Sequence, residues 1–248
     1  MRPESKNKNS VGRKNKLRKF AEILSFPNVY ECYDIKNPAL TRDGVHTIDL
    51  CGRWNEAHFE AQRPITLELA CGGGEYALAL AQRYPDRHFI GVDIKGNRIW
   101  KGAKAALVSG LANVAFLRTR IEIIEHFFAP GEVSEIWITF ADPFPRKGQE
   151  NRRLTAPIFL EKYRALLAPG GTVHLKHDDP QFFEYTLETL ANYPGCRIEL
   201  AEEDIYGRQL PDQIPELSIQ TLYESMHLAL GKSIRYLRFK FDQTEEAK

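Results

Sequence analysis

Two kinds of hydrophobic segment alternate along residues 65–241. Short apolar runs at 65–70 and 88–92 are typical of buried strands, whereas residues 95–108 place apolar side chains on one helical face. The pattern predicts further strands at 114–117, 135–140, 172–176, 196–202 and 234–241. It predicts helices at 75–84, 121–128, 155–167 with Thr155 as the N-cap, 179–192 and 219–230, with a loop at 206–216.

Regular alternation of strand and helix indicates an α/β protein with a doubly wound, Rossmann-like sheet. We expect a mostly parallel sheet with helices on both faces and an antiparallel C-terminal strand. The chain is then divided into a basic arm at 1–19, an N-terminal extension that wraps the core at 20–64, the main domain at 65–242 and a frayed tail at 243–248.

A glycine-rich turn follows the first strand of the main domain. Cys71-Gly72-Gly73-Gly74 lies where only glycine lets the backbone turn tightly against a ligand. Asp93 ends the next predicted strand, 21 residues after Gly72, a spacing that suits a carboxylate accepting hydrogen bonds from ribose hydroxyls. The carboxyl ends of parallel strands share one edge, so the turn and Asp93 are expected to meet there.

The ligand of this turn is more consistent with a cationic nucleoside than with a pyrophosphate. The glycines lack the full G-x-G-x-x-G pattern, and Glu75 follows them directly, so the turn is poorly suited to an anion. S-adenosylmethionine is the common cationic nucleoside cofactor, and a nicotinamide dehydrogenase is disfavoured. A tight connection without a ligand is the alternative for the turn considered alone.

A second group of polar and aromatic residues follows the strand at 135–140. Asp142-Pro143-Phe144-Pro145 combines an acceptor, a flat ring and two prolines that stiffen the backbone, which suits a planar base. A rigid surface turn is the structural alternative. Four cations follow that could hold phosphates beside a base pocket: Arg146, Lys147, Arg152 and Arg153.

Composition and charge add limits on partners and compartment. With 43% hydrophobic residues in 248 the chain can form a sizeable core, and it has no apolar run long enough to span a bilayer and no signal-like N-terminus. We therefore expect a cytoplasmic protein without membrane contact. The four cysteines lack C-x-x-C pairing, and His174 and His177 should lie on opposite faces of a strand, so no metal site is predicted.

The basic residues are concentrated at the N-terminus. Residues 1–19 contain eight Lys or Arg and one acid, Glu4, a net charge of +7 that leaves −6 for the remainder of a chain whose total is +1. Such an arm suits contacts to a phosphate backbone, and a solvated terminus without a partner is the alternative.

Together these segments resemble the bacterial tRNA (guanine-N7)-methyltransferase family. The resemblance covers residues from about 65 to the C-terminus and is carried by 67–75 (LELACGGGE), 89–93 (FIGVD), 140–147 (FADPFPRK), 152–154 (RRL) and 221–224 (TLYE). The Asp-Pro-aromatic segment followed by Arg-Arg-Leu is specific to that family, whereas the glycine turn is common to methyltransferases.

The resemblance implies that S-adenosylmethionine donates a methyl group to N7 of a guanine in the tRNA variable loop. It places Glu68 and Asp93 at the cofactor, Arg120 near the adenine, and the catalytic Asp142 at the reacting centre beside the cofactor; the glycine turn adds Gly72 and Gly74 to the predicted cofactor residues. It places Arg146, Asp178, Thr221, Leu222, Tyr223 and Glu224 at the substrate, to which the basic cluster adds Lys147, Arg152 and Arg153. It implies tRNA as partner and leaves monomer and homodimer open.

Three residues depart from the family pattern. Arg120 stands where an acidic residue is usual near the adenine, Arg146 replaces a usual Lys, and Phe144 replaces a usual Trp. The rival hypotheses are a related methyltransferase acting on an exocyclic amine of adenine and a non-catalytic RNA-binding module that has kept the fold.

Overall fold

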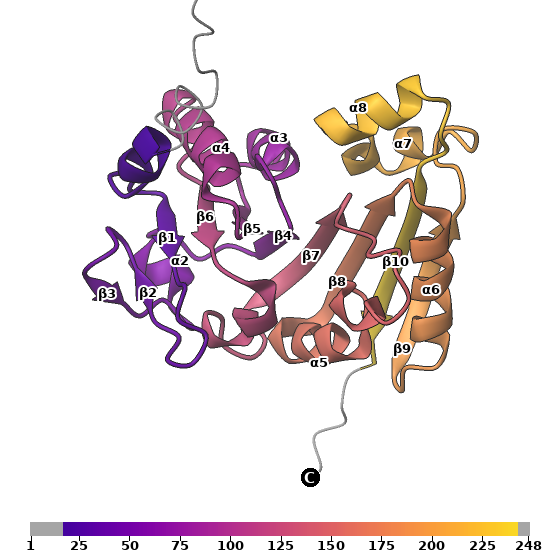
Figure 1. Cartoon of the computed structure of the whole chain (residues 1–248), viewed down its shortest axis with the longest axis horizontal. Helices are drawn as coiled ribbons and strands as arrows, with labels where there is room; N and C mark the ends of the chain where they lie inside the picture. Colours follow the sequence, from indigo (N-terminus) through magenta and orange to yellow (C-terminus); the bar gives the residue numbers. More distant parts are fainter. Residues whose placement is uncertain (1–16, 243–248) are drawn as a thin grey trace, which may run out of the picture.

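The computed structural model describes residues 17–242. Most of the predicted basic arm, residues 1–16, and the predicted tail at 243–248 lie outside these residues. The described part of the chain forms one ten-stranded sheet in the order β3-β2-β1-β6-β5-β4-β7-β8-β10-β9 (Figure 1).

Five parallel strands form the centre of the sheet. They are β6 Val114–Arg118, β5 His88–Asp93, β4 Ile65–Leu69, β7 Val133–Thr139 and β8 Leu167–His177. Beyond them, β10 (Arg235–Phe241) runs antiparallel to both β8 and β9 (Cys196–Glu202). The predicted antiparallel C-terminal strand is therefore confirmed.

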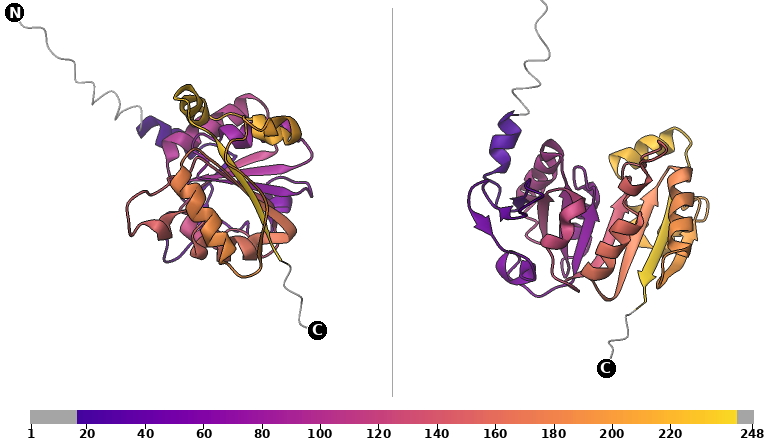
Figure 2. Two further views of the ribbon diagram at one scale, coloured as in Figure 1. Left: turned by 90° about the vertical axis from the view of Figure 1, so that its right-hand side faces the viewer. Right: turned by 60° about the horizontal axis from the view of Figure 1, so that its bottom comes forward.

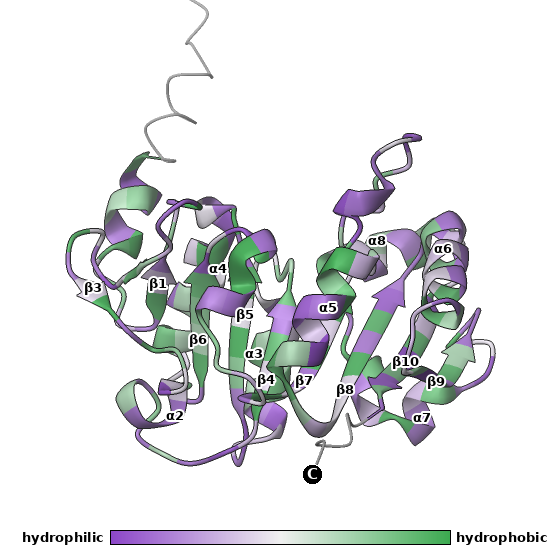
Figure 3. Ribbon diagram, turned by 90° about the horizontal axis from the view of Figure 1, so that it is seen from below, coloured by the Kyte–Doolittle hydropathy of each residue, from purple (hydrophilic) through white to green (hydrophobic). Residues whose placement is uncertain are grey.

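Helices cover both faces of the sheet. The helices α3 (Glu75–Arg83) and α4 (Gly96–Val108) pack into one hydrophobic core, and α5 (Pro157–Leu166) and α6 (Pro180–Ala191) into the other. Figure 2 shows α6 outside strand β10, and Figure 3 shows hydrophobic residues recurring along β6 and β8. Because strand side chains alternate, β7 sends its residues to both cores, and the sheet is doubly wound as predicted.

The N-terminal extension adds an edge to the same sheet. Residues 17–23 are helical, β1 (Val29–Glu31) pairs in parallel with β6, and β2 (Leu40–Thr41) and β3 (Thr47–Ile48) follow antiparallel. The short helix α2 (Trp54–Ala57) buries Trp54, whose Nε1 donates to the Phe127 carbonyl at 2.8 Å. Strands of two or three residues are too short to show alternation, which explains why the sequence pattern missed them.

Local details differ from the sequence predictions at three places. Helix α5 begins at Pro157, and Thr155 does not cap it; the Thr155 hydroxyl instead lies 2.8 Å from that of Thr186 in the core. The segment Ile121–His126 is a 3₁₀ helix, η1. The predicted loop at 206–216 contains two short helices, α7 (Leu210–Gln213) and η3 (Pro215–Ser218), which precede α8 (Leu222–Ala229).

Candidate active site

The glycine-rich turn leaves β4 and enters α3 with a left-handed backbone. Gly72 and Gly74 have φ of +57° and +66°. A Cβ atom on Gly74 would lie 2.4 Å from Cε1 of Phe116, so a side chain there would collide with the core. Gly74 is thus required by both backbone conformation and packing.

Asp93 links the glycine turn to the loop after β5. Its Oδ2 accepts a hydrogen bond from the Gly72 amide at 2.9 Å, and its Oδ1 accepts one from the Lys95 amide at 2.7 Å. A carboxylate oxygen can accept more than one hydrogen bond, so Asp93 keeps acceptor capacity for a ligand.

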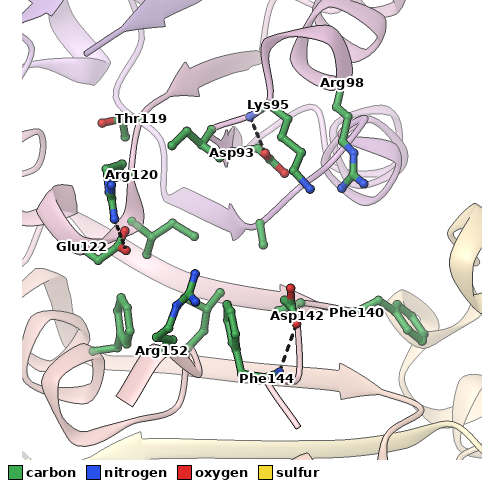
Figure 4. A pocket seen from close by; sticks show the side chains of 16 residues that line it. Asp93, Lys95, Arg98, Thr119, Arg120, Glu122, Phe140, Asp142, Phe144 and Arg152 are labelled. Atoms are coloured by element: carbon green, nitrogen blue, oxygen red, sulfur yellow. Dashed lines mark hydrogen bonds and ion pairs between the residues drawn. The ribbon is translucent and has the colours of Figure 1, made fainter. Parts of the chain in front are cut away.

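A cavity of about 450 Å³ opens at this edge of the sheet (Figure 4). Asp93, the last residue of β5, and Asp142, which follows β7, both line it, together with Phe144. The other lining residues come from the loops after β4, β5, β6 and β7 and from the helices η1, α4 and α5: Ala70, Ile94, Lys95, Arg98, Thr119, Arg120, Ile121, Glu122, Phe140, Ala141, Arg152, Leu154 and Phe159. The two predicted acidic residues are thus brought together in one cavity.

A second cavity, of about 250 Å³, adjoins the first. Ala70, Arg98 and Phe140 line both cavities. The other lining residues come from the glycine turn, α3, α4, the end of β7 and the start of α8: Glu68, Cys71, Gly72, Gly73, Glu75, Asn97, Lys101, Thr139, Thr221, Leu222 and Tyr223. Ala70 and Phe140 directly follow β4 and β7 with φ of +57° and +49°, and such sparsely populated conformations cluster at functional sites.

Glu68 is a buried carboxyl group at the second cavity. One oxygen accepts from the Ala77 amide in the first turn of α3 at 2.8 Å, and the other accepts from the Thr139 hydroxyl at 3.0 Å. Burial raises the pKa of Glu68 to about 8 against these two hydrogen bonds, which lower it. The group is therefore largely protonated at neutral pH.

The loop after β7 positions Asp142 and Phe144. The Phe144 amide donates to Asp142 Oδ1 at 3.1 Å, and the Arg152 guanidinium lies over the Phe144 ring at 4.4 Å. The His177 Nε2 donates to the Ala141 carbonyl at 2.7 Å, and burial lowers the pKa of His177, so a neutral ring holds this loop.

Arg153 does not join the predicted phosphate-binding cluster. The side chain is buried behind the loop, where Nε donates to the Pro143 carbonyl at 2.9 Å and the guanidinium lies over the Tyr185 ring. Arg146, Lys147 and Arg152 are exposed and remain available for phosphates.

Arg120 lines the first cavity together with an acidic partner that the sequence pattern did not single out, and its contact with the cofactor stays a prediction. Arg120 Nη2 donates to Glu122 Oε1 at 3.1 Å, and both residues line the cavity. Glu122 therefore places a carboxylate at the same cavity, two positions after Arg120.

Asp178 lies apart from the two cavities. Its carboxylate pairs with His227 Nδ1 at 2.8 Å and Lys232 Nζ at 2.6 Å, beside a shallow hollow that Arg235 also lines. These contacts tie the end of β8 to α8 and to the connection that follows it, and the substrate contact of Asp178 stays a prediction.

Glu224 is fully buried in an ion pair, and its role at the substrate stays a prediction. Its side chain and that of Lys176 are both 0% exposed, and Lys176 Nζ lies 2.7 Å from Glu224 Oε1. The Tyr206 hydroxyl also donates to Glu224, and Thr221 caps α8 by accepting from the Glu224 amide. Only Thr221, Leu222 and Tyr223 of this segment line the second cavity.

Several residues at the site were missed from the sequence, although one signal was present. Lys95 and Arg98 lie at the start of α4, where the helix dipole disfavours cations, which suggests a further reason for their presence. Thr119, Thr139 and Lys176 carry no comparable signal.

The histidines of β8 have separate partners. His174 Nδ1 lies 2.7 Å from the Tyr236 hydroxyl, whereas His177 contacts the loop after β7. Within residues 17–242 no group of three His, Cys, Asp or Glu side chains could hold a metal ion. In the same part of the chain, every helix is too short or too polar to cross a membrane.

The fold is that of a Rossmann-like, class I methyltransferase. The antibiotic-resistance methyltransferase Kmr aligns with a TM-score of 0.53 and 18% identity over 82% of this chain and 98% of its own. The 16S rRNA methyltransferase KamB aligns with a TM-score of 0.58 and 16% identity over 81% of this chain and 98% of its own. At these identities the likeness establishes the fold alone.

Sequence comparisons identify the family. Residues 62–237 match a family described as "Putative methyltransferase". A tRNA (guanine-N(7)-)-methyltransferase of Bacteroides thetaiotaomicron is 46% identical over 93% of this chain and 87% of its own. Those of Christiangramia forsetii and Geobacillus kaustophilus are 46% and 36% identical, over 93% and 74% of this chain and 99% and 81% of their own. The chain therefore belongs to the tRNA (guanine-N7)-methyltransferase family and is a methyltransferase.

We expect the loss of the buried Lys176–Glu224 ion pair to destabilise the protein strongly. Replacing Lys176 by Met leaves the Glu224 carboxylate buried without its charge partner, so we expect the free energy of unfolding to fall by about 3 kcal/mol. Lys101→Met is the matched control, because Lys101 is 65% exposed in its pair with Glu75 and its loss should cost less than about 1 kcal/mol. Urea denaturation of both variants measures this, and equal losses would contradict a structural role for the buried pair.

Proposed function

We propose that this protein transfers a methyl group from S-adenosylmethionine to N7 of a guanine in the tRNA variable loop. The observation that carries the proposal is that Asp93 and the Asp142–Phe144 loop line one cavity. The relatives' names support guanine N7 of tRNA as the acceptor, and the meeting of both loops at the carboxyl ends of the strands supports a ligand site there. A tRNA substrate also makes the cytoplasm the expected compartment.

The two cavities have the size and donor set for S-adenosylmethionine. The hydroxyl of Thr119 is buried at the first cavity and has no hydrogen-bond partner among the described residues, which favours a polar ligand there. Asp93 offers acceptors to the ribose hydroxyls, with Ile94 and Ile121 as apolar neighbours for the adenine. Arg98 can hold the carboxylate of the methionine part, and Glu68 can balance the positive charge of the cofactor.

Alignment is the main task of the protein side chains. S-adenosylmethionine supplies, when bound, an electrophilic methyl group, and guanine N7 attacks with an in-plane lone pair, so no general base is needed. Two binding sites that hold donor and acceptor in line within roughly 3 to 3.5 Å can contribute several kcal/mol to the rate.

Asp142 is assigned to the guanine. One of its oxygens is held by the Phe144 amide, and Oδ2 has no partner among the described residues, so it can accept from the N–H groups of the Watson–Crick edge. The ring of the methylated guanine gains positive charge, which the same carboxylate stabilises. Phe144 offers a stacking face, and Arg146, Lys147 and Arg152 lie nearby for phosphates.

The direct test is incubation of the purified protein with labelled S-adenosylmethionine and bulk tRNA, followed by nucleoside analysis. Labelled 7-methylguanosine in tRNA is the expected product. Labelled methyladenosine would favour the related adenine enzyme, and no binding of S-adenosylmethionine by calorimetry would favour a non-catalytic RNA-binding module.

Asp142→Ala should separate cofactor binding from turnover. We expect affinity for S-adenosylmethionine to stay within about twofold, and kcat to fall about 100-fold, the usual loss for one electrostatic group at a reacting centre. Calorimetry and single-turnover methylation of tRNA measure the two quantities. Near wild-type turnover would show that Asp142 is not catalytic.

Donor binding should depend on pH through Glu68. Because the pKa of Glu68 is about 8 in the free protein, a cation bound beside it must displace a proton below that pH. Affinity for S-adenosylmethionine should therefore rise about 50-fold from pH 6 to pH 8, with the ionised fraction of Glu68, and level off above about pH 9. Glu68→Gln should flatten the profile. Calorimetry in buffers of different ionisation enthalpy measures the released proton, and a flat wild-type profile would rule out this linkage.

The basic arm should contribute to tRNA binding through charge. We expect deletion of residues 1–19 to weaken tRNA binding and to reduce the slope of log K against log salt, because fewer phosphates are neutralised. Cofactor affinity should change little. Filter binding at several salt concentrations gives the slope. An unchanged slope would show that the arm does not contact phosphates.

A further inference from the structure

Helix α8 has an inverted hydrophobic pattern. Leu222, Tyr223, Met226 and Leu230 are 59%, 45%, 53% and 73% exposed, and at 3.6 residues per turn they fall within an arc of about 100°. We call these four residues the α8 stripe. The opposite side of the helix carries the fully buried carboxylate of Glu224. A helix that turns apolar residues outward and an acid inward is the reverse of an ordinary surface helix.

The buried side of α8 fixes this orientation. Lys176 Nζ pairs with Glu224 and also donates to the carbonyls of Leu217 and Ile219, at 2.8 and 3.0 Å. Burying the two charged groups costs desolvation energy, whereas turning the apolar α8 stripe inward would gain energy from the burial of apolar surface. The hydrophobic effect alone would therefore favour the opposite orientation of the helix. The outward direction of the α8 stripe is therefore determined by specific polar contacts.

The α8 stripe continues into the second cavity. Leu222 and Tyr223 line that cavity, and the Arg98 guanidinium from α4 donates to the Tyr223 hydroxyl at 3.0 Å. Figure 1 shows α8 standing across from α3 and α4 at the end of the sheet toward which β7 runs. Lys95 and Lys101 are exposed on the α4 side, whereas Arg98 is half-buried, so an apolar surface faces two exposed cations.

We propose that the α8 stripe binds an unpaired nucleobase of tRNA next to the target guanine, while the exposed Lys95 and Lys101 of the α4 side bind adjacent phosphates. This rests on the proposed function. A guanine can enter the cavity only when it is unstacked from its neighbours, which leaves the flat face of a flanking base without a partner. An aromatic ring and aliphatic side chains provide that partner, and base contacts of this kind tolerate any sequence.

The charges beside the α8 stripe favour RNA over a second copy of this chain. A stable protein interface buries about 800 Å² on each partner, far more than four side chains offer. Cations along the rim of the site complement the phosphates of a polyanion.

The test uses variants outside both cavities. Met226→Gln with Leu230→Gln removes the distal half of the α8 stripe, and Val45→Gln with Val108→Gln is the matched control, because these valines are 76% and 81% exposed and line neither cavity. For the α8 variant we expect at least about fivefold weaker tRNA binding and a matching rise in KM for tRNA. Affinity for S-adenosylmethionine and the melting temperature should not change, and the control should match wild type.

Other outcomes would overturn the proposal in distinguishable ways. Wild-type tRNA affinity in the α8 variant, in a protein that forms 7-methylguanosine, overturns this inference alone. A wild-type dimer that becomes monomeric in the α8 variant, with tRNA affinity unchanged, assigns the α8 stripe to a second copy. A wild-type protein that methylates no tRNA overturns the proposed function and this inference together. A photo-reactive benzoylphenylalanine at position 226 should cross-link to tRNA, and cross-linking only to another copy would contradict the proposal.

Discussion

The site depends on two hydrogen bonds that the Asp93 carboxylate accepts from backbone amides. They join the glycine turn after β4 to the loop after β5, and therefore fix the start of α3 relative to the start of α4. The parallel pairing of the two strands, with Leu69 opposite Val92, brings both loops to one edge. One carboxylate thus organises the edge of the cavity and still presents acceptor capacity to a ligand.

The wall of the second cavity that α8 forms is held by an ion pair. Lys176 at the end of β8 and Glu224 of α8 form a fully buried ion pair, and the Lys176 ammonium also satisfies two carbonyls that precede α8. This wall is held by polar contacts that leave the apolar side of α8 facing outward. One wall of the site is therefore held by backbone amides on a carboxylate, whereas the other is a helix oriented by a buried ion pair.

The sequence alone determined the order of the central elements and the core of the site. Short apolar runs predicted β4, β5 and β7 because strands covered on both faces carry few polar residues. Once those strands are parallel, their carboxyl ends must share an edge, so Gly72, Asp93 and Asp142 could be grouped before any coordinates. The family resemblance rested on the same segments.

Only the tertiary structure decided which charged residues face a ligand and which hold the fold. Arg153 and Glu224 look in the sequence like any surface cation or acid, yet both are buried, and Asp178 pairs with His227 and Lys232 away from the cavities. Glu122 lines the cavity, although its position in the sequence gave no sign of it. The reason is physical. Hydrophobic periodicity in the sequence indicates which apolar side chains are buried, but the partner of a charged side chain comes from an element far away in the chain and is known only once the chain has folded.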